Sequence, residues 1–159
     1  AEAWARGVAA NFARQPQGGD TDQLLAVAAG ECQAAISNHY YLVRLLTSKK
    51  PEDVAAGAKL QAIFPDQTGR GVHANISGAA VLKSAPNKAN AQKFVEFMVS
   101  DEAQRYFAES NFEIPVVASV KPPAPVAALG TFKIDPINVR VYGENQAAAQ
   151  QAYDRAGWK

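Results

Sequence analysis

Residues 36–44 read ISNHYYLVR, and the interpretation of the whole chain starts from this stretch. Residues 32–37 are a short apolar run bounded by polar residues, which predicts a buried strand. A helix is expected to follow over residues 40–48 and to end before Lys49-Lys50-Pro51. Tyr40 and Tyr41 therefore stand where a strand passes into a helix. Ligands of α/β proteins bind beyond the carboxyl ends of the strands, so this junction is a candidate binding site.

Two adjacent phenols can offer two hard, anionic oxygens to one cation. A trivalent iron ion suits them, because small, highly charged cations prefer oxygen to sulfur. A free tyrosine titrates near pH ~10, but a bound cation favours the charged form. Iron would therefore hold Tyr40 and Tyr41 as phenolates at neutral pH. The alternative is structural: one ring packs in the core and the other lies on the surface.

Two neighbours of the pair are candidates for supporting roles. Arg44 lies four residues after Tyr40 and three after Tyr41, which places it on the adjoining helix face. Its guanidinium could keep phenolates charged or clamp an anion with two hydrogen bonds, or it could be an ordinary solvated arginine. Asn38 could cap the helix, support the ligands, or do both.

Composition sets broad limits on function. The chain has 159 residues, enough for one domain, with 48% hydrophobic and 19% charged residues, as is usual for globular proteins. A net charge of +1 gives no electrostatic basis for binding nucleic acid. Cys32 is the single cysteine, which excludes an intrachain disulfide. Residues 1–4 do not resemble the start of a signal peptide.

Apolar spacing, caps and breakers predict the remaining elements. Helices are expected over residues 2–14, over 89–99, from 101 onward after a Ser100 cap, and over 144–156. Another is expected through residues 23–29, after a cap at Asp20 or Thr21 and before a stop at Gly30. Strands are expected over residues 60–64 and 72–83, and residues 121–125 are expected to form a stiff connector. Strands that alternate with helices indicate an α/β arrangement.

The run from Asn38 to Tyr41 resembles the Asn-x-Tyr-Tyr signature of bacterial periplasmic ferric-iron-binding proteins, the substrate-binding components of iron ABC transporters. Further segments resemble that family in the same order along nearly the whole chain. These segments are residues 11–20, 64–67, 71–78, 100–104, 111–116 and 157–158. Each is weak alone, but their combined order and spacing are specific.

The resemblance implies an α/β fold of the class II periplasmic-binding type, with two lobes and a cleft between them, of which this chain is the second half. Residues 1–70 would form part of the second lobe, residues 71–121 would belong to the first lobe, and residues 122–159 would return to the second. The 71–121 segment would then expose apolar faces. We therefore expect the chain to pack against another chain, a complementary half or a swapped copy.

The resemblance also implies a function. Tyr40 and Tyr41 would bind ferric iron in the interlobe cleft, and Asn38 and Arg44 would support these ligands or a companion anion such as carbonate. Remaining ligands would come from the missing N-terminal half. The closed protein would deliver iron to an ABC-type permease in the membrane. The location would be periplasmic, with the export signal outside this chain, and no enzymatic activity is expected.

Two other functions remain open on the sequence. The first is a binding protein of the same fold for an oxyanion or a small organic ligand, without metal. The second is an iron-dependent enzyme, which needs a cluster such as two histidines and a carboxylate. His39 and His73 form no such motif. His39 should point about 100° away from Tyr40 around the helix, and His73 is expected to make a structural hydrogen bond.

Overall fold

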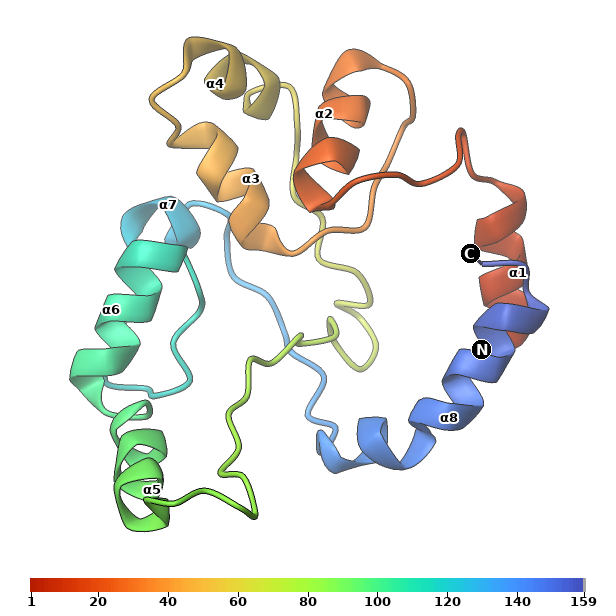
Figure 1. The fold of residues 1–159 in the computed structure, drawn as a ribbon. Coiled ribbons are helices and arrows are strands. Elements are labelled where there is room, and N and C mark those ends of the chain that lie inside the picture. Colours follow the sequence, from red (N-terminus) through yellow and green to blue (C-terminus); the bar gives the residue numbers. More distant parts are fainter. Residues whose placement is uncertain (159) are drawn as a thin grey trace.

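The computed structural model describes residues 1–158, which form eight helices joined by extended segments (Figure 1). The helices are α1 (Glu2–Ala10), α2 (Asp20–Ala29), α3 (His39–Leu46), α4 (Pro51–Gly57), α5 (Lys88–Phe97), α6 (Asp101–Asn111), α7 (Ala124–Ala127) and α8 (Arg140–Arg155). Within these residues no sheet forms, and the only strand-like pairing is an isolated parallel bridge between Val72 and Ile134.

The main core lies between α2, α3 and α4, which contact one another, while α7 contacts α3. Leu24 of α2 meets Leu42 and Leu45 of α3 there, and the half-buried Tyr41 packs against this cluster. Val43 is fully enclosed. Burial of these apolar side chains is what holds an eight-residue helix in place, because so short a helix is marginal in water by itself. The core therefore fixes the helix that carries both tyrosines.

Helices α5 and α6 form one group away from this core, and helices α1 and α8 form another (Figure 1). Helix α6 begins at the Ser100 cap, as expected, because the Ser100 hydroxyl accepts a hydrogen bond from the Ala103 N–H. Helices α1 and α8 pack together, with Trp158 against Trp4 and an ion pair between Arg155 and Glu2. Helices α5 and α8 bury none of their residues fully.

The three expected strands are absent from the described chain. Residues 32–37, 60–64 and 72–83 form neither helix nor strand, and beyond the single bridge at Val72 no neighbouring strand pairs with them. Their apolar side chains are consequently open to solvent: Ile36 is 74% exposed, Ile63 81% and Leu82 71%. A strand is defined by its ladder, so an apolar sequence pattern without a partner gives only extended chain.

Helix boundaries also differ from the expected ones. Helix α1 ends at Ala10, four residues early, α8 begins at Arg140, four residues early, and α3 ends at Leu46 instead of residue 48. Helices α4 and α7 were not expected. Helix α7 overlaps the end of the expected connector over residues 121–125. Pro125 takes one of its first helical positions, which proline tolerates because the missing N–H needs no partner there.

Two segments that are distant in sequence, residues 71–72 and 133–135, run side by side. Val72 donates a backbone hydrogen bond to the Lys133 carbonyl, and Asp135 donates one to the Val72 carbonyl, both at 2.9 Å. Gly71 has a φ of +106°, and a Cβ there would stand 2.6 Å from the Lys133 oxygen, so only glycine fits. Arg70 adds an ion pair with Asp135 at 2.8 Å. These contacts set the course of the chain after the tyrosine helix.

Candidate metal centre

Tyr40 and Tyr41 lie in the first turn of α3, immediately beyond the extended residue Asn38. Their ring centroids are 4.6 Å apart, with an angle of 41° between the ring planes. Consecutive helix residues normally point about 100° apart. The two rings are nevertheless close, so both phenols lie on one side of the helix start. The N–H groups of a first helical turn favour negative charge nearby. The position therefore suits phenolate oxygens.

Arg44 covers both rings. Its guanidinium carbon is 5.2 Å from the Tyr40 centroid and 5.4 Å from the Tyr41 centroid, within the range of cation–π attraction. The predicted helical offsets thus bring the three side chains together. The positive charge also favours the ionised form of the Tyr40 phenol.

The Tyr40 phenol is harder to ionise than a free tyrosine. Burial raises the pKa of Tyr40, the neighbouring Tyr41 phenol and the Asp20 carboxylate raise it further, and Arg44 opposes the shift. Without a cation the phenol is therefore neutral at physiological pH. A cation that binds here must displace its proton.

Asn38 does not cap α3 with its side chain, in contrast to what the sequence suggested. Its side-chain oxygen instead accepts a hydrogen bond from the Asn75 amide at 3.0 Å. Its backbone N–H donates to the Asp20 carboxylate at 2.9 Å. Sequence reasoning considered Asp20 only as a helix cap and gave Asn75 no role, since both lie far from Asn38 along the chain.

Both histidines make structural contacts. A ring nitrogen of His39 lies 2.8 Å from the Phe112 carbonyl oxygen, which links α3 to the end of α6. The His73 ring lies 3.1 Å from the Tyr142 hydroxyl, a side-chain hydrogen bond of the expected kind. Nowhere in residues 1–158 do three His, Cys, Asp or Glu side chains gather closely enough to hold a metal ion.

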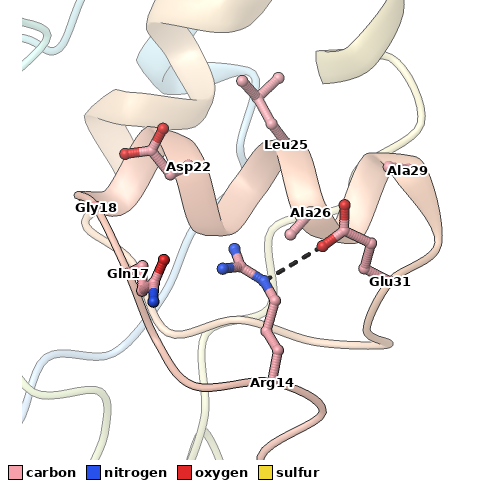
Figure 2. A pocket seen from close by; sticks show the side chains of 8 residues that line it. All are labelled: Arg14, Gln17, Gly18, Asp22, Leu25, Ala26, Ala29 and Glu31. Carbon is pink, nitrogen blue, oxygen red and sulfur yellow. Dashed lines mark ion pairs between the residues drawn. The ribbon is translucent and has the colours of Figure 1, made fainter.

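A separate hollow of about 530 Å³ lies beside α2 (Figure 2). It is lined by Arg14, Gln17, Gly18, Asp22, Leu25, Ala26, Ala29 and Glu31. Arg14 and Glu31 face each other across it and form an ion pair at 3.3 Å (Figure 2). Neither tyrosine contributes to its lining, so the hollow is distinct from the tyrosine pair.

None of the helices in residues 1–158 combines the length and the apolar character that crossing a membrane requires.

Residues 2–134 match the family model described as "Bacterial extracellular solute-binding protein". The chain belongs to this family of bacterial extracellular solute-binding proteins.

Individual relatives are similar across nearly the whole chain. Iron uptake protein A1 of Synechocystis sp. is 45% identical over 157 residues, which make up 99% of this chain and 44% of that protein. A Trichodesmium protein solved in complex with iron and citrate ligands has a TM-score of 0.93 at 52% identity. The ferric binding protein from Campylobacter jejuni has a TM-score of 0.94 at 46% identity. Both structures match 99% of this chain and 50% of their own.

The chain spans about half the length of the relatives it matches. The likeness confirms the family resemblance and the fold class expected from the sequence, that of half a periplasmic-type binding protein.

Proposed function

We propose that this chain binds ferric iron through the phenolates of Tyr40 and Tyr41 and serves, as part of a solute-binding protein in the periplasm, to deliver iron to an ABC-type permease. The observation that carries the proposal is the 4.6 Å approach of the two rings at a helix start. The iron-related names of the relatives support the choice of cargo. The protein is proposed to act by binding and release, without catalysing a reaction.

Arg44 and Asn38 are proposed to support the site. Arg44 offers a charge that compensates two phenolates, or a clamp for a companion anion such as carbonate. The 5.2 and 5.4 Å approaches to the rings favour the first role. Asn38 holds the start of α3 through its two hydrogen bonds.

Further iron ligands are proposed to come from outside residues 1–159, from the half of the fold that this chain does not span. The exposed side chains of Ile36, Ile63 and Leu82 on unpaired extended segments fit strands supplied by such a partner. In this arrangement residues 71–121 belong to the first lobe, and residues 1–70 and 122–159 belong to the second. Closure of the lobes would bury the metal.

The test of the iron site is the visible spectrum of the protein, expressed from its natural gene, after addition of ferric citrate. We expect an orange-red phenolate-to-iron charge-transfer band that is absent from the double variant Tyr40→Phe/Tyr41→Phe. Tyr142→Phe is the matched control, because it removes a phenol on α8 that pairs with His73, and it should keep the band. A colourless wild type would favour an oxyanion or organic ligand instead.

The same protein preparation tests whether iron binding releases protons from the phenols. Each phenol that loses its proton on binding makes the apparent affinity rise about tenfold per pH unit below its pKa. Competition with a chelator of known pH dependence should therefore show a marked loss of iron between neutral and mildly acid pH. An affinity that is constant over this range would contradict phenolate ligation.

A further inference from the structure

Asn38, two residues before Tyr40, is held by two segments that are distant in sequence. The Asp20 carboxylate accepts from its N–H at 2.9 Å, and the Asn75 amide donates to its side-chain oxygen at 3.0 Å. The Asn38 carbonyl accepts from the Tyr41 N–H at 3.2 Å. Asn38 thus joins these two outer anchors directly to the backbone of the tyrosine turn.

Asn75 lies on a segment whose course is already fixed. Val72, three residues earlier, pairs with the 133–135 backbone through two hydrogen bonds of 2.9 Å. Asn75 itself is exposed, so no core packing explains its orientation. Within residues 1–158 its side chain hydrogen-bonds only to Asn38. The Asn75 amide therefore connects the bridged segments to the start of α3.

We infer that Asn75 is a positioning residue for the tyrosine pair, acting through Asn38, with Asp20 as the second anchor of the same residue. This inference rests on the proposed iron function. A trivalent cation needs both phenolate oxygens at fixed distances, and displacement of a supporting group by about 1 Å weakens such sites strongly. Loss of the Asn75 amide would free the first turn of α3 to shift while the core beneath Leu42 and Leu45 stays intact.

The test uses Asn75→Ala in the protein expressed from its natural gene. We expect iron release to a chelator to quicken about three- to tenfold, the range for loss of one hydrogen bond, and the charge-transfer band to shift. The thermal melting curve of the iron-free protein should barely change, because Asn75 is exposed. Asn145→Ala is the matched control: its exposed amide bonds only to the Val141 carbonyl of its own helix.

A second variant and a double-mutant cycle distinguish a positioning role of Asn75 from a general contribution to the fold. Asn75→Asp places an acceptor opposite the Asn38 oxygen, so it should release iron faster than Asn75→Ala. If Asn75 acts through Asn38, the double variant Asn38→Ala/Asn75→Ala should release iron no faster than Asn38→Ala alone.

The outcomes distinguish the positioning role of Asn75 from the iron site itself. A wild-type band with unchanged band position and release rate in both Asn75 variants would overturn the positioning role and leave the iron site standing. Additive effects of Asn38→Ala and Asn75→Ala would also overturn it, since Asn75 would then act by another route. A wild type without any band would overturn the iron site and this role together.

Discussion

The side chain of Gln67 pairs with the backbone of Lys133 as a neighbouring strand would. The Lys133 N–H donates to the Gln67 side-chain oxygen at 2.7 Å, and the Gln67 amide donates to the Lys133 carbonyl at 3.2 Å. This contact lies next to the backbone bridge between Val72 and Ile134. One glutamine thereby extends a pairing that the backbone makes at a single point.

Replacement of Gln67 tests how much this pairing contributes to the stability of the fold. Gln67→Ala removes these two hydrogen bonds and a third, from the Gln67 amide to the Pro65 carbonyl. It should lower the free energy of unfolding by about 1 kcal/mol, because the contact is exposed and each such bond contributes little net stability. Urea denaturation measures the loss. Gln92→Ala, which removes an exposed helix-surface contact with Glu96, should change stability by less. Equal losses in the two variants would contradict a special role for Gln67.

Asp20 and Arg44 act on the Tyr40 phenol in opposite directions, and two variants should separate them. Asp20→Asn keeps an acceptor for the Asn38 N–H but removes the negative charge, so the pKa of Tyr40 should fall. Arg44→Gln removes the opposing positive charge, so the pKa should rise. Ultraviolet titration of tyrosinate in iron-free protein, with Tyr40→Phe to identify the signal, measures both. Shifts of the same sign would show that the charges do not act as described.

The raised pKa of Tyr40 predicts how the iron-free protein responds to alkali. The pKa in the folded state lies above the usual value of 10.0, so the contribution to stability is complete below about pH 10 and is lost as pH rises through the folded pKa. Tyr40→Phe should make stability less dependent on pH in that alkaline range. Denaturation midpoints measured on either side of pH 10.0 would reveal this. Identical alkaline losses in wild type and variant would refute it.

His39 is expected to stabilise the fold and not to bind iron. Its 2.8 Å contact with the Phe112 carbonyl ties α3 to the end of α6. His39→Ala should therefore cost about 1 kcal/mol of stability and leave the charge-transfer band in place. His39→Gln, whose amide can also donate, should recover part of the stability. Disappearance of the band in a folded His39→Ala protein would make His39 a ligand.

The helices were predicted better than any other feature of the fold, because their caps and stops are local sequence signals. The Ser100 cap and the left-handed stop at Gly30, with a φ of +81°, both appear where the sequence placed them. Helix α4 was missed although Pro51 is at its first position and Glu52 and Asp53 follow, because the lysines and proline were interpreted as a break. A proline in the first turn starts a helix as readily as it ends one.

The strands could not be predicted correctly because pairing is not local. Residues 32–37 and 60–64 have the apolar character of buried strands, but no strand pairs with them among residues 1–158. The proposed site shows the same limit. Helical spacing correctly brings Arg44 to Tyr40 and Tyr41, whereas the contacts of Asn38 with Asp20 and Asn75 join residues 18 and 37 positions apart. No periodic pattern encodes such contacts.

The lone bridge between Val72 and Ile134 has a mechanical consequence. The bridge does not act alone, because the Gln67 side chain on Lys133 and the ion pair between Arg70 and Asp135 flank its two hydrogen bonds. Together these contacts couple residues 67–72 to residues 133–135, so a displacement of one segment carries the other with it. Through the Asn75 amide, the shared displacement would reach Asn38 and the start of the tyrosine helix.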